Sequence, residues 1–335
     1  MKFYKIIFFN TMIFGTLMTI SAMSWFTMWM GLEINLLSII PLMKSNKNLF
    51  PSEASIKYFI TQTMASTIIL LAIIMNLNIE EFIPQNSQLF SNMMMNSGLM
   101  TKMGAAPFHY WFPEVMEGLN WNTCLIMLIW QKIAPMIILM YNLNMTIFLS
   151  MIIIISALIS GTIGLNQISL RKIMTYSSIN HIGWMIGSML QSTSIWMIYF
   201  ITYSVISINI ILIFKTYSIF SIKQIFNVLN HEKSMKFLFI LNFLSLGGIP
   251  PFLGFLPKWF TINYLIENNF YFLSAILIVL TLITLYFYIR VTFSTILIYS
   301  SENIKYKQTQ LSFSTMTFNF LSLSGLAICT FLMNF

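Results

Sequence analysis

Four charged side chains interrupt long apolar stretches of this sequence. They are Glu33 in WMGLEINLLSII, Lys102 in GLMTKMGAAPF, Lys132 in MLIWQKIAPMI and Lys258 in PPFLGFLPKWF. A charged side chain at the centre of a bilayer costs roughly 2.5–3.5 kcal/mol on insertion scales, so such residues commonly pair with one another and mark ion paths. The residue types therefore indicate transfer of protons or cations across a membrane.

A buried lysine is a group that can hold or release a proton near neutral pH. Burial disfavours the charged form of lysine or glutamate, and an opposite charge nearby favours it. Movement of Glu33 towards or away from Lys102 would therefore switch Lys102 between its two forms. Water and hydroxyl groups that continue from Lys102 to Lys132 and on to Lys258 would carry a proton sideways through the membrane. A purely structural salt bridge is the alternative interpretation of these charges.

Two histidines lie where they could extend such a path. His181 is in the middle of the apolar run YSSINHIGWMI, and His109 follows Pro107. Because histidine titrates near neutral pH, each is a possible relay, with a satisfied structural histidine as the alternative. Arg290 lies near a helix end, from which its long side chain can reach the membrane surface.

The elements that must position these residues are membrane-spanning helices. The chain has 335 residues, of which 58% are hydrophobic and 8% charged, whereas a soluble domain carries about a quarter charged residues. Apolar runs of about 20 residues recur along the whole length. We predict an all-α polytopic membrane protein with about 11 transmembrane helices at 3–22, 24–43, 54–76, 89–117, 122–142, 146–166, 172–190, 194–215, 236–264, 270–298 and 312–334.

Two of these spans contain a matching proline-rich motif. Residues 104–113 read GAAPFHYWFP and residues 248–257 read GIPPFLGFLP, so both fit G-x-x-P-F-x-x-x-x-P. They fall in the fourth and ninth spans, and each is therefore the fourth helix of a five-helix set. Because five is odd, the second set enters from the opposite side, as in transporters with inverted repeats. We expect a first repeat at 1–143, a second at 144–299, and a loop with a C-terminal transmembrane helix at 300–335.

Proline inside a span breaks the helix and frees backbone carbonyl groups. In hydrocarbon these groups need partners from a water-lined cavity or from neighbouring helices. Two matched breaks beside lysines therefore favour two places where water or polar side chains enter the bundle, with a packing kink as the alternative.

The loop charges predict the orientation. Loops on the side of the N-terminus carry thirteen of the seventeen Lys and Arg residues, and the opposite loops carry none. By the positive-inside rule the N-terminus is inside and the C-terminus outside. The basic loops can also meet anionic lipid, so the net charge of +8 requires no nucleic acid.

Cysteine usage argues against a metal or iron–sulfur site held by this chain. Cys124 and Cys329 are far apart in apolar runs, and the sequence has no CxxC or Cys/His cluster. Such clusters are what protein-held zinc and iron–sulfur centres require. The heavy use of Phe, Ile, Met, Asn, Lys and Tyr suggests an AT-rich genome such as that of a mitochondrion.

Several longer motifs resemble one known family. WMGLEINLLSIIPL, EASIKYFITQTMAS, KMGAAPFHYWFPEVMEGLNW, WQKIAPM, GLNQISLRKIMTYSSINHIGWM and NFLSLGGIPPFLGFLPKW are similar, in this order, to NADH dehydrogenase (ubiquinone) subunit 2 of animal mitochondria, and to its insect-like form in particular. The resemblance covers nearly the whole chain. It is weakest at 77–95, at 216–235 and over the last forty residues.

The resemblance implies an antiporter-like membrane subunit of respiratory complex I with two inverted five-helix repeats. It implies proton-translocation roles for Glu33, Lys102, Lys132 and Lys258, and it matches His181 to a polar site on the family's central water-filled axis. Redox chemistry would occur elsewhere in the complex, so NADH, FMN, iron–sulfur clusters and ubiquinone are expected outside this chain and no cofactor within it. Expected partners are other membrane-arm subunits, including neighbouring antiporter-like subunits, and phospholipids such as cardiolipin.

The expected location is the mitochondrial inner membrane, crossed many times, with the N-terminus in the matrix and the C-terminus in the intermembrane space. Two other functions stay open on sequence grounds. A stand-alone cation/proton antiporter would have the same repeats and charges. A structural membrane-arm subunit with no pumping of its own would need the repeats only for packing.

Overall fold

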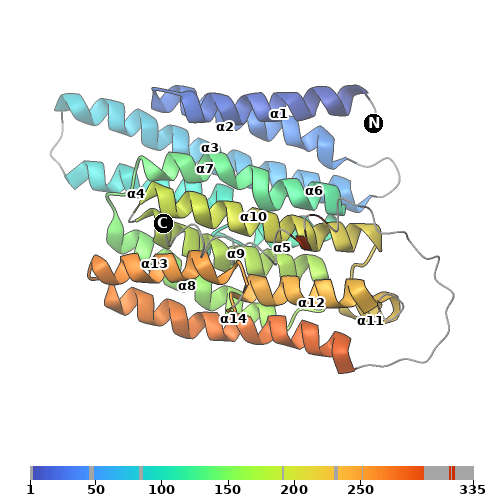
Figure 1. Cartoon of the computed structure of the whole chain (residues 1–335). Helices are drawn as coiled ribbons and strands as arrows, with labels where there is room; N and C mark the ends of the chain where they lie inside the picture. Colours follow the sequence, from blue (N-terminus) through green and yellow to red (C-terminus); the bar gives the residue numbers. More distant parts are fainter. Residues whose placement is uncertain are drawn as a thin grey trace. The chain divides into compact units, whose positions relative to one another are not determined.

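The computed structural model describes residues 3–44, 49–82, 86–190, 192–229, 233–250, 252–297, 317, 319 and 320. Within these residues the elements are helices, together with one isolated antiparallel bridge between Ser169 and Ser221. Contacts along the chain define two compact units, Met1–Ile155 and Ser156–Phe335. The helices of both units are drawn in Figure 1.

The first unit is built from helices that pair along the chain. Its helices are α1 (Phe3–Ser21), α2 (Trp25–Met43), α3 (Phe50–Phe82), α4 (Asn86–Met103), α5 (Trp111–Gly118), α6 (Trp121–Leu125), the π-helical turn η1 (Ile126–Trp130), α7 (Gln131–Met140) and the start of α8 (Thr146–Leu165). The α1 and α2 helices lie side by side (Figure 1). Small residues permit this approach, because a Cβ atom on Gly31 would lie 2.9 Å from the carbonyl oxygen of Gly15.

The second unit surrounds a helix that is buried on all sides. After the end of α8 it contains α9 (Leu170–Met189), α10 (Thr193–Thr216), α11 (Ile222–Leu229), α12 (Lys233–Gly247), α13 (Phe255–Glu267) and α14 (Tyr271–Leu297). Every residue of α9 from Ile173 to Met189 is buried, and α9 contacts α10, α13 and α14. The polar side chains of α9 therefore face protein rather than lipid.

The two proline motifs break their helices at the same point. The α4 helix stops just before Gly104, with φ of +75°, and the α12 helix stops just before Gly248, with φ of +76°. Only glycine adopts this left-handed conformation at little cost. These two glycines occupy the first position of the shared motif, so one local sequence produces both breaks.

Backbone hydrogen bonds at the two breaks also correspond, 144 residues apart. The N–H of Ala105 donates to the carbonyl of Met100 over 3.0 Å, and that of Ile249 donates to Leu244 over 3.4 Å. These are the bonds that close a helix behind a left-handed glycine. The second half-helices begin at corresponding positions of the motif, because α5 starts at Trp111 and α13 at Phe255.

The helices agree with the predicted spans as far as residue 297. Each of the first ten spans contains one helix or one interrupted helix, and the fourth and ninth are interrupted. Within the described residues, seven helical segments are long and apolar enough to cross a membrane by length and composition. The α9 helix is too polar to meet that criterion, and the halves α4, α5, α12 and α13 are too short or too polar. The protein is thus an all-helical membrane protein, and the layout of about 11 spans stays a prediction.

Two elements were not foreseen. The segment 216–235, which lies between two predicted spans, contains α11, and the predicted span 122–142 contains the π-helical turn η1. The predicted C-terminal helix and the segment 300–335 lie outside the described residues, apart from residues 317, 319 and 320. Pro251, in the second motif, also lies outside them.

Candidate functional site

Glu33 and Lys102 form an ion pair inside the first unit. The serine cap at Ser24 begins α2, because its side-chain oxygen accepts from the N–H of Thr27, and Glu33 follows on this helix. Lys102 is in the last turn of α4. Its Nζ lies 3.7 Å from Oε1 of Glu33, and the two side chains are 4% and 22% exposed respectively. This distance is that of an ion pair rather than of a close hydrogen bond.

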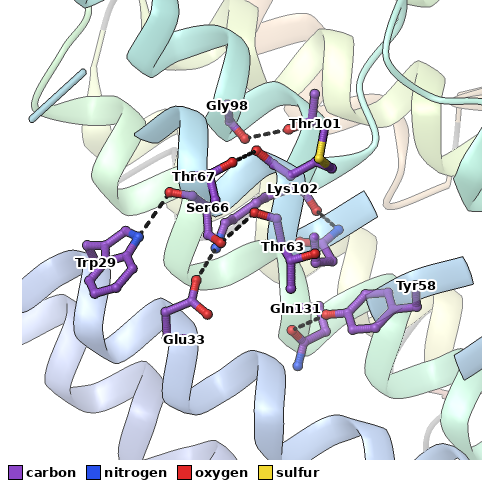
Figure 2. A network of polar contacts seen from close by, with 12 residues as sticks. Trp29, Glu33, Tyr58, Thr63, Ser66, Thr67, Gly98, Thr101, Lys102 and Gln131 are labelled. Atoms are coloured by element: carbon purple, nitrogen blue, oxygen red, sulfur yellow. Dashed lines mark hydrogen bonds and ion pairs between the residues drawn. The ribbon is translucent and has the colours of Figure 1, made fainter. Parts of the chain in front are cut away.

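Residues of α3 lie beside this pair (Figure 2). Trp29 donates to the carbonyl oxygen of Ser66 over 3.0 Å, which ties α2 to α3. The Gln62 side-chain amide donates to the carbonyl oxygen of Lys102 over 3.4 Å, which ties α3 to the end of α4. Side-chain hydrogen bonds therefore join α3 to α2 and to α4 near the ion pair.

A small polar cavity lies next to Lys102. Its walls carry Leu32, Asn35, Leu36, Tyr58, Gln62, Lys102, Gln131 and Pro135, and it has room for about one water molecule. The hydroxyl of Tyr58 donates to Oε1 of Gln131 over 3.4 Å, and Nε2 of Gln131 donates to Oδ1 of Asn35 over 3.0 Å. Figure 2 shows Tyr58 and Gln131 facing one another. These three polar residues connect α2, α3 and α7 beside the lysine.

Lys132 is buried next to this cavity on a different face of α7. It is 1% exposed, and its Nζ lies 5.6 Å from the ring centroid of Phe112 on α5. A cation in this position is attracted to the aromatic face. Among the described residues that line the cavity, α7 contributes Gln131 and Pro135 and not Lys132. The structure thus places Lys132 in the same unit as the Glu33–Lys102 pair, directly after Gln131, which lines the cavity beside Lys102.

Lys258 lies at the break of the second unit. It belongs to the first turn of α13, is 7% exposed, and its Nζ donates to the carbonyl oxygen of Gly247 over 2.8 Å. That oxygen ends α12, where helix carbonyls carry partial negative charge. The Nζ also lies 5.8 Å from the ring centroid of Trp184. The helix break therefore provides an acceptor for the buried lysine.

The two histidines are both buried and both hydrogen-bonded. Nδ1 of His181 is 2.9 Å from the hydroxyl oxygen of Tyr199, and the His181 ring lies 5.0 Å from that of Tyr203, centroid to centroid. Nδ1 of His109 is 3.3 Å from the carbonyl oxygen of Pro107. Because a carbonyl only accepts, Nδ1 of His109 carries the hydrogen in that contact. Relay roles for both histidines stay predictions.

Arg290 is exposed and donates to the carbonyl oxygen of Leu165 at the end of α8. This arrangement matches a side chain at the helix periphery. Among the described residues no group of three or more His, Cys, Asp or Glu side chains could hold a metal ion.

Sequence reasoning missed Asn35, Tyr58 and Gln131. Their signal was present but weak, since Gln131 directly precedes Lys132 and Asn35 follows Glu33 by two positions. Amides and tyrosines are common in apolar helices. Only the lateral packing of α2, α3 and α7 shows that these residues meet.

Comparison with known proteins identifies the family to which this chain belongs. A family described as NADH:quinone oxidoreductase/Mrp antiporter, TM, matches residues 22–284. NADH-ubiquinone oxidoreductase chain 2 of Anopheles gambiae is 49% identical over 332 residues, which covers 96% of this chain and 96% of that protein. The Bos taurus protein of the same name is 37% identical over 322 residues, covering 93% and 92%. The chain belongs to the NADH-ubiquinone oxidoreductase chain 2 family.

Solved structures share the fold at low sequence identity. A chain of respiratory complex I from Thermus thermophilus superimposes with a TM-score of 0.86 at 18% identity, covering 98% of this chain and 78% of that one. A chain of the Mrp complex from Dietzia sp. superimposes with a TM-score of 0.73 at 15% identity, covering 84% and 58%. The arrangement of helices is therefore common to both kinds of complex.

Proposed function

We propose that this chain is a core membrane subunit of the proton-pumping NADH:ubiquinone oxidoreductase, respiratory complex I. Its family membership and the likeness of its fold to a chain of respiratory complex I support this assignment. In this role the chain is part of an enzyme but has no redox site of its own. NADH, FMN, iron–sulfur clusters and ubiquinone are handled by other subunits.

The buried charges carry the proton through this chain. The observation that supports this most directly is the Glu33–Lys102 ion pair at 3.7 Å, in which both side chains are largely withdrawn from the surface. Separation of the two charges would favour release of the Lys102 proton, because a buried ammonium loses its counter-ion. Lys132 and Lys258 follow as further proton-holding groups, with His181 and His109 as possible relays. Each proton moved against 100 mV requires about 2.3 kcal/mol for the electrical part alone.

The architecture proposed for this function has about 11 spans in two inverted five-helix repeats. The corresponding breaks at Gly104 and Gly248 support it, since they share their left-handed glycine and their closing hydrogen bonds. The proposed boundaries are 1–143, 144–299 and 300–335. Division of the chain by contacts into Met1–Ile155 and Ser156–Phe335 is a coarser description.

The proposed setting is the mitochondrial inner membrane, in keeping with the animal relatives. The N-terminus lies in the matrix and the C-terminus in the intermembrane space. Partners are the other membrane-arm subunits, including neighbouring antiporter-like subunits, and phospholipids such as cardiolipin.

The test is the ratio of protons pumped to electrons transferred by the intact complex in sealed vesicles, with Lys132 replaced by Met. We expect a lower ratio with electron transfer retained, because Met fills similar space and cannot hold a proton. An unchanged ratio in a fully assembled complex would leave this chain as a structural subunit. Ion flux through the purified single chain would instead support a stand-alone cation/proton antiporter.

A further inference from the structure

We propose that Gln131 is a positioning residue that holds a water molecule beside Lys102. Tyr58 and Asn35 fix the Gln131 amide, and the water connects Lys102 to α7, the helix that carries Lys132. This inference rests on the proposed function, since it adds a positioning residue to the same proton path.

The amide of Gln131 is fixed at both of its polar atoms. Nε2 donates to Asn35 on α2 over 3.0 Å, and Oε1 accepts from the hydroxyl of Tyr58 on α3 over 3.4 Å. Asn35 and Tyr58 are each 3% exposed, and Gln131 is 9% exposed. A buried amide is costly unless it is hydrogen-bonded. Its partners therefore determine which way the amide points, and Gln131 is held against the cavity wall.

The backbone carbonyl of Gln131 is a second polar group of the same residue that can accept a hydrogen bond. Pro135 has no N–H, so the carbonyl oxygen of Gln131 lacks its usual α-helical donor four residues later. Gln131, Pro135 and Lys102 all line the cavity. A water there can accept from Nζ of Lys102 and donate to this carbonyl oxygen. A buried water typically needs two to four such partners, and polar residues among the lining, Lys102, Gln131 and Gln62, are candidates for them.

The π-helical turn sets the face that Gln131 presents. A π-turn holds one residue more than an α-turn, and each residue of an α-helix advances by about 100° around the axis. In an uninterrupted α-helix running on from α6, Trp130 would occupy the angular position that Gln131 now has. An indole there would fill the space beside Lys102. The turn Ile126–Trp130 thus places the side chain of Gln131, rather than the indole of Trp130, at the cavity.

Lys132 itself points elsewhere, which is why an intermediary is needed. Neighbouring helical residues are separated by about 100°, and Lys132 lies against Phe112 while Gln131 lies in the cavity. In the proposed path a proton that leaves Lys102 for Lys132 passes Gln131, the residue of α7 that lines the cavity and directly precedes Lys132.

The test measures the proton-to-electron ratio of the intact complex in sealed vesicles for Gln131→Leu and, separately, for Lys132→Met. Gln131→Leu keeps the bulk of the side chain and removes both amide atoms. We expect it to lower the ratio to the value seen with Lys132→Met. Tyr58→Phe, which removes one oxygen and preserves packing, should give a smaller decrease in the same direction and serves if Gln131→Leu fails to assemble.

Asn96→Leu is the matched control. The Asn96 side chain donates to the carbonyl of Asn142 over 3.2 Å and accepts from its amide over 3.1 Å, so it is a buried amide link in the same unit away from the lysines. It should leave the ratio unchanged. A lowered ratio with Lys132→Met but a normal one with Gln131→Leu and Tyr58→Phe would overturn the positioning role alone. A normal ratio with Lys132→Met would overturn the proposed proton path and this role with it.

Discussion

The amino group of Lys258 donates a 2.8 Å hydrogen bond to the carbonyl oxygen of Gly247, the last residue of α12. Lys258 starts from the next half-helix, α13, so its side chain bridges the break in the chain. The C-terminal end of a helix carries partial negative charge. The broken helix thus provides a counter-charge from the backbone, whereas Lys102 receives one from Glu33 on another helix.

Two adjacent glycines at this break should differ sharply in their tolerance of alanine. At Gly248, φ is +76° and an added Cβ would lie 2.8 Å from Cδ of Lys258. We expect Gly248→Ala to cost about 1–2 kcal/mol from the left-handed conformation, plus displacement of the lysine. At Gly247 the nearest atom to an added Cβ is 3.6 Å away, so Gly247→Ala should be neutral or stabilising. Thermal unfolding of the assembled complex measures both, and equal destabilisation would contradict this account of the break.

The Glu33–Lys102 pair should show strong energetic coupling. Removal of one partner from a buried ion pair costs roughly 3–5 kcal/mol, so Glu33→Gln and Lys102→Met should each destabilise the chain. The double variant should be less destabilised than the sum of the two, because it leaves no uncompensated charge. The measurement is a double-mutant cycle on the thermal stability of the complex.

The matched control for that cycle is the pair formed by Lys57 and Glu114. Their charged atoms are 3.0 Å apart, but the side chains are 44% and 61% exposed. Exposed pairs contribute little because water screens them. Additive effects at Glu33 and Lys102, no different from those at Lys57 and Glu114, would show that burial of the first pair has no energetic consequence.

The extra residue of the π-turn should be removable. Deletion of Ile126 turns the π-turn into an α-turn and leaves Gln131 and Lys132 on their present faces, because the residue lost is the one that the wider turn accommodates. Deletion of Ile137, later in the same helix, must rotate either the lysine or the residues after it by about 100°. Both isoleucines are half-buried. We expect assembly and pumping to survive the first deletion and to fail after the second.

The measurements for these deletions are the amount of assembled complex and its proton-to-electron ratio. Loss of assembly in both variants would mean that the complex needs the π-helical turn itself in order to assemble, and not only the faces on which Gln131 and Lys132 lie. Survival of both would mean that the face of Lys132 is unimportant.

The helices could be predicted from the sequence because the features that produce them lie within short contiguous segments. Apolar runs long enough for a bilayer, and glycine and proline at two breaks, are properties of contiguous residues. The pairing of Glu33 with Lys102 was also predicted, since a charge inside a bilayer needs a partner and few are available.

Entry of water or polar side chains beside Lys102 was predicted from the helix break, but the residues that line the cavity were not, because they depend on how each helix is rotated about its axis. The turn Ile126–Trp130 contains no proline or glycine that would predict it. This turn nevertheless determines that Gln131 lines the same cavity as Lys102. The contact of Gln131 with Tyr58 joins positions far apart in sequence, and nothing in either local segment specifies it. The short helix α11 was missed for a different reason, since eight residues in a polar stretch resemble a loop.

The burial of α9 has a consequence for how the protein is made. From Ile173 to Met189 every residue of this helix is buried, including Asn180 and His181, and the helix is absent from the segments apolar enough to cross a membrane. Such a segment gains little by partitioning into lipid alone. Its place in the bilayer depends on the neighbours that cover its polar groups, above all α10, which follows it directly and packs against it. We therefore expect insertion of α9 into the membrane to depend on α10, which is synthesised after it.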